Sequence, residues 1–187
     1  HEGLIHQPPM RGLTLALNEP IGVLGLVCPD EAPLLGMLSM LLPAIAMGNS
    51  VVLVPSRPFA LVATDFYQVL ETSDVPSGVL NIVTGDGATG AAIVDHDDID
   101  KIAFTGSTEV GRTIRRQTAG TGKSLTLELG GKSPFIVFAD AEIDAAVEGV
   151  VDAIWFNQGQ VCCAGARILV AEAIAERFEV LLKARMK

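Results

Sequence analysis

A glycine-rich loop near the end of the sequence carries the residue best suited to covalent chemistry, Cys162. The loop reads Gly-Gln-Val-Cys-Cys-Ala-Gly over residues 159–165, and its small side chains would leave the sulfur accessible. A thiol beside backbone N–H donors can have its pKa lowered and then acts as a nucleophile. The alternative is a small buried hydrophobic residue, the commoner state of a cysteine in a mostly apolar chain, and this alternative also describes Cys163.

The apolar run of residues 125–129, Leu-Thr-Leu-Glu-Leu, contains one carboxylate, Glu128. A carboxyl group carried into an apolar environment has its pKa raised, which suits a general base that must activate water near neutral pH. The alternative is a glutamate that faces solvent from an edge strand. Residue type alone does not choose between these two interpretations.

The chain passes from a predicted strand into a predicted helix at residues 104–111, which read Phe-Thr-Gly-Ser-Thr-Glu-Val-Gly. This passage indicates an anion site. Free backbone N–H groups and the helix dipole favour a negative group there, Gly106 permits its close approach, and Ser107 can donate a hydrogen bond. A pyrophosphate fits this description. The alternative is a Ser or Thr helix cap in a tight turn. The turn Gly85-Asp86-Gly87 after an earlier strand is a weaker signal of the same kind.

The composition of the chain argues against several classes of binding partner and site. The chain of 187 residues has a formal net charge of −9, which argues against nucleic acid, because phosphate binding needs clustered Lys and Arg. His1, His6 and His96 lie far from the cysteines and show no metal-ligand spacing, so no metal site is expected. Three cysteines without a disulfide framework, and no signal peptide, indicate a reducing cytoplasm.

A charge-free stretch over residues 32–56 is long enough to span a membrane. Pro33, Pro43 and the break at Gly48-Asn49-Ser50, followed by a β-branched run, instead predict a buried helix, a turn and a buried strand. We therefore expect no membrane span. The sequence also begins without Met and stops inside an amphipathic helix, so we expect a piece of a longer protein.

Strands and helices alternate along the first two thirds of the chain. Apolar runs predict strands over residues 13–17, 21–27, 50–54, 79–83 and 101–105. Helical patterns predict four helices, of which one ends at about Met47, one covers residues 60–71, one begins at Gly85 and one covers residues 107–118. This alternation predicts right-handed βαβ crossovers and an α/β fold with a doubly wound parallel sheet. The aliphatic, aromatic-poor composition suits such a sheet, which is buried on both faces.

Two further apolar runs, residues 124–129 and 134–138, are separated by the pair Gly130-Gly131, which marks a hinge or a domain crossing. We place a domain boundary there, with one domain over residues 1–130 and the start of a second over residues 131–187. Asp140 is then the expected N-cap of an alanine-rich helix that reaches about Phe156 and leads into the loop of Cys162.

Three motifs together resemble those of the aldehyde dehydrogenase superfamily in their order, their spacing and their residues. The phrases FTGSTEVG (residues 104–111), LELGGKSPFIVFADA (127–141) and FNQGQVCCAGAR (156–167) look like that family's cofactor loop, general-base strand and nucleophile loop. The resemblance implies a modified Rossmann-type dinucleotide-binding domain, without a G-x-G-x-x-G motif, followed by the start of an α/β catalytic domain. It also implies NAD or NADP as cofactor, a small-molecule aldehyde as substrate and a homo-oligomer in the full-length protein.

The resemblance assigns roles to individual residues. Cys162 would be the catalytic thiol and Glu128 the general base. The expected cofactor contacts are Gly106 and Ser107 at the pyrophosphate, Gly87 on the adenosine side, Val110 near the adenine, and Gly130. The implied reaction is the oxidation of an aldehyde to a carboxylic acid through a thiohemiacetal and a thioester on Cys162.

The first half of the chain departs from the family pattern. Glu31, within Pro-Asp-Glu-Ala-Pro (residues 29–33), stands where an asparagine would stabilise the oxyanion, and Met40 stands where a lysine is usual. Val54 and Arg57 replace the lysine and the acid that hold the adenosine ribose, and Arg57 offers donors for the 2′-phosphate of NADP instead.

This pattern resembles the degenerate module of two-module members of the superfamily, here joined to an intact catalytic segment. Two functions therefore follow from the sequence. The first is an aldehyde dehydrogenase with unusual cofactor and oxyanion contacts, and the second is a catalytically impaired module with a structural or partner-binding role.

Overall fold

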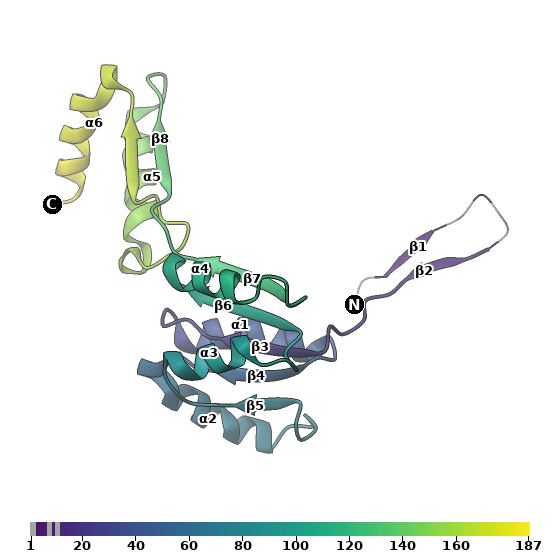
Figure 1. Ribbon diagram of the computed structural model, residues 1–187. Coiled ribbons are helices and arrows are strands. Elements are labelled where there is room, and N and C mark those ends of the chain that lie inside the picture. Colours follow the sequence, from purple (N-terminus) through teal and green to yellow (C-terminus); the bar gives the residue numbers. More distant parts are fainter. Residues whose placement is uncertain (1–2, 7–8, 10–11) are drawn as a thin grey trace. The chain divides into compact units, whose positions relative to one another are not determined.

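The computed structural model describes residues 3–6, 9 and 12–187 (Figure 1). These residues form two compact units, which divide between Glu128 and Leu129. Each unit has its own sheet and its own cluster of buried apolar side chains, so each is described by itself.

The first unit is built on a five-stranded sheet with the strand order β5-β4-β3-β6-β7. Its first strand, β3, lies in the middle. The chain winds outward from there through β4 and β5 and then crosses to β6 on the other side of β3. The pairs β3–β4, β3–β6 and β4–β5 are parallel. This arrangement confirms the predicted α/β fold with a doubly wound sheet. The strands are β3 (Val23–Val27), β4 (Ser50–Val54), β5 (Leu80–Ile82), β6 (Lys101–Gly106) and β7 (Ser124–Leu129).

Helices cover both faces of this sheet, as parallel strands require. In Figure 1, α3 and α4 lie in front of the sheet and α1 lies behind it. Helix α3 approaches β3 so closely that a Cβ atom at Gly25 would lie 2.5 Å from Cγ2 of Ile93. The helices are α1 (Pro33–Ala46), α2 (Ala60–Glu71), α3 (Gly87–Asp95) and α4 (Thr108–Gln117), and a short 3-10 turn, η1 (Arg57–Phe59), precedes α2.

The charge-free stretch of the sequence forms α1 and β4 and supplies much of the core of the first unit. Its almost fully buried side chains are Met37, Leu41, Val51 and Leu53, which pack with Leu26 of β3. Burial of a side chain of this size stabilises the fold by ~1.5–3 kcal/mol. The predicted helix, turn and buried strand are confirmed, but the helix is buried on one face only, since Leu34, Leu35 and Leu42 of α1 are exposed. Among the described residues, no helix is long and apolar enough to cross a membrane.

The turn between α1 and β4 is held by the buried side chain of Asn49. Its Oδ1 accepts hydrogen bonds from the backbone N–H groups of Ile21, at 2.6 Å, and Gly22, at 3.1 Å. Its Nδ2 donates to the carbonyl oxygen of Ala44 at 2.9 Å. One amide therefore ties the end of α1 to the segment that enters β3.

A two-stranded antiparallel hairpin precedes β3 and consists of β1 (Leu4–His6) and β2 (Thr14–Ala16). The strand predicted over residues 13–17 is confirmed as β2. The sequence did not predict β1, because Leu4 and Ile5 stand there as a pair of apolar residues and form no longer run like the one over residues 13–17.

The second unit pairs two parallel strands with two helices. The strands are β8 (Pro134–Val137) and β9 (Arg167–Val170), and the helices are α5 (Ile143–Trp155) and α6 (Glu172–Arg185). Its core consists of Val137, Ile143, Val147, Val150 and Phe178.

The prediction that Asp140 caps α5 is wrong. The cap is Glu142, whose Oε2 accepts a hydrogen bond from the N–H of Ala145 at 2.7 Å. The N–H of Ala141 bonds to the carbonyl of Phe138 at 3.1 Å, so a turn occupies the residues around Asp140 and delays the helix.

Candidate functional site

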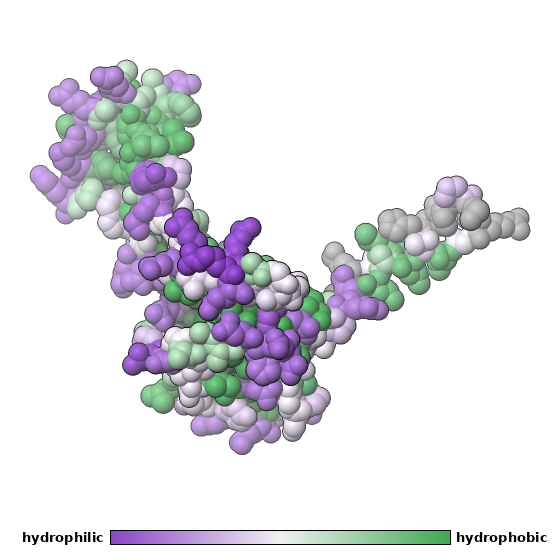
Figure 2. Space-filling view, in the orientation of Figure 1, coloured by the Kyte–Doolittle hydropathy of each residue, from purple (hydrophilic) through white to green (hydrophobic). Residues whose placement is uncertain are grey.

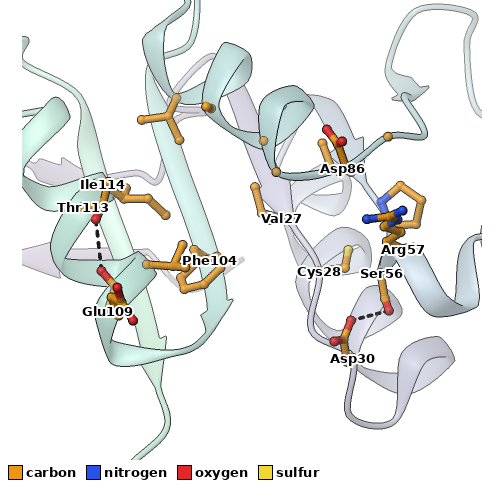
Figure 3. A pocket seen from close by; sticks show the side chains of 18 of the residues that line it. Val27, Cys28, Asp30, Ser56, Arg57, Asp86, Phe104, Glu109, Thr113 and Ile114 are labelled. Carbon is orange, nitrogen blue, oxygen red and sulfur yellow. Dashed lines mark hydrogen bonds between the residues drawn. The ribbon is translucent and has the colours of Figure 1, made fainter.

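A pocket of about 430 Å³ opens at the carboxyl ends of the central strands of the first unit (Figure 3). Val27 ends β3, Val54 ends β4, and Phe104 lies near the end of β6, and all three line the pocket. Strand order reverses between β3 and β6. In doubly wound sheets, ligands bind at this reversal, outside the carboxyl ends of the strands.

The pocket has two walls, and polar and apolar side chains line both of them (Figure 3). One wall comes from β6 and α4 and presents apolar groups, Phe104, Val110 and Ile114, together with the polar side chains of Glu109 and Thr113. Val110 is 46% exposed, which is high for an apolar side chain. The other wall follows β3, β4 and β5. Its polar and charged groups are Asp30, Ser56, Arg57 and Asp86.

A short hydrogen bond joins two residues of the wall that follows β3 and β4. The buried hydroxyl of Ser56 donates to Oδ1 of Asp30 at 2.6 Å, and these residues follow β4 and β3 respectively. Cys28 lies beside them, and its backbone N–H bonds to the carbonyl of Val54 at 2.9 Å. Burial raises the pKa of the Cys28 thiol to about 12, so this sulfur is a neutral thiol at physiological pH.

The two helices at the pocket begin with side-chain caps. Asp86 accepts a hydrogen bond from the N–H of Ala88 at 2.9 Å and starts α3, and Ser107 accepts one from the N–H of Val110 at 3.3 Å and starts α4. Ser107 therefore makes the helix cap that the sequence offered as its alternative role. Gly106 is required locally, because a Cβ atom there would lie 2.6 Å from the ring of Phe104.

Three of the predicted cofactor residues line the pocket, namely Gly87, Val110 and Arg57. Gly106 and Ser107 lie next to it, between Phe104 and Glu109, which both line it. Gly130 belongs to the second unit, where it precedes β8, and it stays a predicted contact.

The loop after β3 carries Glu31, the residue expected at the oxyanion position. Glu31 is exposed and is followed by Ala32, the N-cap of α1, which has a φ of 45° in the left-handed region. A non-glycine residue in this conformation is uncommon and costs of order 1–3 kcal/mol. The loop is packed tightly, since a Cβ atom at Gly36 would lie 2.7 Å from Cγ of Pro29.

Glu128 lies on β7, at the edge of the five-stranded sheet. Exposure alternates along β7, so that Ser124, Thr126 and Glu128 share the exposed face. Of the two interpretations that the sequence left open, the structure matches the glutamate that faces solvent from an edge strand, because its leucine neighbours point to the other face. Glu128 lines a groove of about 350 Å³ that also includes Met40 and Thr105.

The loop that carries Cys162 contains residues with left-handed backbone conformation, and a side-chain hydrogen bond to a backbone carbonyl closes it. It follows α5 through a 3-10 turn, η2 (Phe156–Gly159), in which Asn157 and Gln158 have φ values of 49° and 61°. Nδ2 of Asn157 donates to the carbonyl of Gln160 at 3.1 Å. Two non-glycine residues in this region store backbone strain close to the predicted nucleophile.

The thiol of Cys162 is exposed at the end of this loop. The hydroxyl of Ser133, at the start of β8, donates to the carbonyl oxygen of Cys162 at 3.3 Å. Cys163 is also exposed, so the prediction of a buried side chain there is wrong. All three cysteines are free thiols. Within the described part of the chain, no group of three His, Cys, Asp or Glu residues is arranged to hold a metal ion.

Sequence reasoning missed three of the residues that shape these sites, Asp30, Ser56 and Ser133. The hydrogen bonds of these residues join positions that are 26 and 29 residues apart. No local pattern in the sequence marks such a pair.

The chain matches the profile of the aldehyde dehydrogenase family over residues 2–187. It belongs to that family. The aldehyde dehydrogenase of Emericella nidulans is 49% identical over 175 residues, which cover 92% of this chain.

Solved structures give the same family and the same fold. An NADP dependent enzyme of E. coli has a TM-score of 0.86 and 35% identity, and covers 99% of this chain and 39% of its own. A betaine aldehyde dehydrogenase of Staphylococcus aureus in complex with NAD+ has a TM-score of 0.86 and 34% identity, over 98% of this chain and 37% of its own. The chain spans 35% of the length of its Emericella relative, so it corresponds to about a third of that aldehyde dehydrogenase.

Proposed function

We propose that this chain carries the cofactor pocket and the nucleophile of an enzyme that oxidises an aldehyde to a carboxylic acid with NAD or NADP. The observation that carries the proposal is the exposed Cys162 thiol in its closed, glycine-rich loop, within a chain of the aldehyde dehydrogenase family. Two similar proteins support the cofactor class, since one is described as NADP dependent and the other was crystallised with NAD+.

The pocket at the carboxyl ends of β3, β4 and β6 fits the adenosine half of a dinucleotide. Val110 and Ile114 offer an apolar surface for a base, and Gly87 lines the same pocket. The opposite wall carries donors and acceptors for a ribose. The N-terminus of α4, after Gly106 and Ser107, would hold the pyrophosphate, because its first N–H groups and the helix dipole favour negative charge. When bound, the nicotinamide accepts a hydride.

In the proposed reaction the Cys162 thiolate adds to the aldehyde carbon, which forms a C–S bond and an oxyanion. A bound NAD or NADP would take the hydride from the same carbon, and Cys162 would then hold the acyl group as a thioester. Glu128 then removes a proton from water, whose oxygen attacks the thioester carbon. The C–S bond breaks, and the carboxylic acid and the Cys162 thiol are released.

Glu31 stands at the position proposed for the oxyanion donor. An ionised carboxylate cannot donate a hydrogen bond, and the loss of one such donor typically slows a reaction by about 10²–10³-fold. We therefore propose a slow enzyme. The same residue favours a second candidate function, a catalytically impaired module with a structural or partner-binding role.

Covalent trapping separates the two functions. The chain is incubated with an aldehyde and NAD or NADP, and mass spectrometry of its peptides locates any acyl group. We expect an acyl adduct on Cys162, none in Cys162→Ala, and an adduct of similar yield in the matched control Cys163→Ala, because only the first thiol is the proposed nucleophile. An adduct that survives Cys162→Ala overturns the assignment, and the absence of any adduct in the parent supports the impaired module.

A further inference from the structure

The loop of Cys162 is tied to the segment that enters β8. The hydroxyl of Ser133, the residue before β8, donates a hydrogen bond to the carbonyl oxygen of Cys162 at 3.3 Å. Ser133 is partly buried, whereas the thiol of Cys162 is exposed. The two residues are 29 positions apart and belong to the same unit, so this bond is a tertiary contact inside one packed part of the chain.

Two more contacts bring the end of the loop to the same segment. Nε of Arg167, the first residue of β9, donates to the carbonyl of Lys132 at 2.7 Å, and the backbone N–H of Arg167 bonds to the carbonyl of Ser133 at 3.1 Å. Gly165 lies so close to β8 that a Cβ atom there would lie 3.0 Å from Cβ of Phe135. The segment that enters β8 therefore also holds the loop on the far side of the nucleophile.

Such contacts matter for this loop because its backbone stores strain. Asn157 and Gln158, at its start, have the left-handed φ values of 49° and 61°. Two other hydrogen bonds of the loop are internal, from Nδ2 of Asn157 to the carbonyl of Gln160 and from the N–H of Ala164 to the carbonyl of Val161. An internal bond shapes a loop, whereas a bond to a neighbouring element also fixes the direction in which the loop points.

The bond from Ser133 acts on the backbone of the nucleophile itself. The carbonyl carbon and the Cβ atom of Cys162 are attached to the same Cα atom, so a fixed carbonyl limits the directions in which the sulfur can point. A nucleophile that adds to a carbonyl carbon must approach it with aligned orbitals, and a small misplacement slows the addition. Ser133 can therefore affect the reaction through the orientation of the thiol.

We propose that Ser133 is a positioning residue for the nucleophile, which holds the carbonyl of Cys162 so that the thiol is oriented toward the acyl carbon of the substrate. The inference rests on the proposed function, since it takes Cys162 as the nucleophile. Loss of the Ser133 hydroxyl should slow addition of the thiol to a carbonyl group. It should not change how accessible the thiol is.

Two reagents separate orientation from accessibility. The chain is treated with p-nitrophenyl acetate, which acetylates a thiol through addition to a carbonyl, and in parallel with iodoacetamide, which alkylates it at a saturated carbon. Mass spectrometry of the peptides gives the rate of each modification at Cys162. Alkylation depends mainly on whether the thiol is accessible, whereas acetylation also depends on the angle of approach.

We expect Ser133→Ala to slow acetylation of Cys162 about fivefold, as the loss of one neutral hydrogen bond provides, and to leave alkylation within about twofold of the parent. Ser133→Thr keeps the hydroxyl and should restore acetylation to within about twofold of the parent.

Arg167→Met provides a test that does not depend on the stability of the Ser133 variants. This substitution removes the side-chain bond to Lys132 and leaves the Ser133 hydroxyl in place. Because it loosens the segment that carries Ser133, it should also slow acetylation more than alkylation, by about twofold to fivefold.

One control is matched in chemistry and the other in position. The hydroxyl of Ser73 also donates to a backbone carbonyl, that of Leu70 at 2.8 Å, but it belongs to the first unit. Lys183 belongs to α6 of the second unit, and Figure 2 shows hydrophilic side chains along the left edge of this unit, where Figure 1 places α6. Ser73→Ala and Lys183→Gln should both react like the parent with the two reagents.

The outcomes separate this inference from the proposed function. If Ser133→Ala is acetylated as fast as the parent, if both modifications slow equally, or if Ser133→Thr restores nothing, the role of Ser133 is overturned while Cys162 stands as the nucleophile. If the parent chain is not acetylated at Cys162, both the nucleophile and the inference are overturned.

Discussion

The three thiols of this chain occupy environments that assign them different chemistry. Cys162 and Cys163 are exposed, whereas Cys28 is buried beside the candidate pocket. Burial removes the hydration that stabilises a thiolate, which raises the pKa of Cys28 from 9.0 to about 12. At the scale of the residue, the buried thiol therefore affects stability and the exposed thiol of Cys162 is the one suited to covalent reaction.

The raised pKa of Cys28 predicts a loss of stability at high pH. The folded protein keeps a proton that the unfolded chain releases above pH 9.0, so this contribution is fully present below that pH and is lost as the pH rises toward 12. At about pH 10.5 the loss should be about 2 kcal/mol. Urea denaturation of the parent and of Cys28→Val at about pH 8 and about pH 10.5 measures it as a difference.

The control for this prediction is Cys163→Ser, which removes an exposed thiol. It should follow the parent at both pH values. If Cys28→Val loses as much stability as the parent between the two pH values, then Cys28 does not hold its proton in the folded state.

At the scale of elements, the doubly wound sheet depends on how its crossovers are anchored. The turn from α1 to β4 returns the chain to the edge at which β3 begins, and Asn49 joins these segments through three hydrogen bonds. Asn49 itself and its bond to the carbonyl of Ala44 are buried, and its bonds to the N–H groups of Ile21 and Gly22 are partly buried. The fold loses stability when backbone groups in such places lose their partner.

We predict that Asn49→Ala lowers the free energy of unfolding by about 2–4 kcal/mol, since it removes three hydrogen bonds and leaves two partly buried backbone N–H groups without their partner. Urea denaturation monitored by circular dichroism measures the change. Asn81→Ala is the matched control. Asn81 also donates to backbone carbonyls, of Gly78 and Val51, but it is exposed, and its removal should cost less than about 1 kcal/mol. Equal losses in the two variants would contradict the role assigned to Asn49.

At the scale of the whole molecule, the two residues assigned to the proposed reaction belong to different units. Glu128 ends the first unit and Cys162 belongs to the second, so the base and the nucleophile are carried by separately packed parts of one chain. The two residues act on different steps of the proposed mechanism. Removal of the base should therefore separate formation of the thioester from its hydrolysis.

We predict that Glu128→Gln slows thioester hydrolysis by about 10²-fold and leaves acylation of Cys162 nearly unchanged, because a general base contributes at least that much. An activated ester such as p-nitrophenyl acetate reports both steps, as a rapid first release of nitrophenol and a slower steady rate. Glu176→Gln, on the exposed face of α6, is the control and should turn over like the parent. A steady rate in Glu128→Gln equal to that of the parent would make Glu128 structural.

Much of the fold was accessible from the sequence because the evidence for it is local. The uncharged run of residues 32–56 predicts α1 and β4, since a buried helix and a buried strand both need apolar side chains on every face that meets the core. The alternation of strands and helices predicts the doubly wound sheet, because parallel strands need crossover helices. The residues around Ser107 and Cys162 were recognisable as motifs for the same reason, since each motif is contiguous.

The tertiary structure decided which side chains meet and which are exposed. Glu128 faces solvent because β7 is an edge strand with alternating faces, and the sequence shows neither the edge nor the face. Glu142 caps α5 in place of Asp140 because a turn after β8 delays the helix. The bond from Ser56 to Asp30 exists because strand order sets the ends of β3 and β4 side by side. Local patterns extend over a few residues, whereas these contacts depend on strand order, which only the folded chain defines.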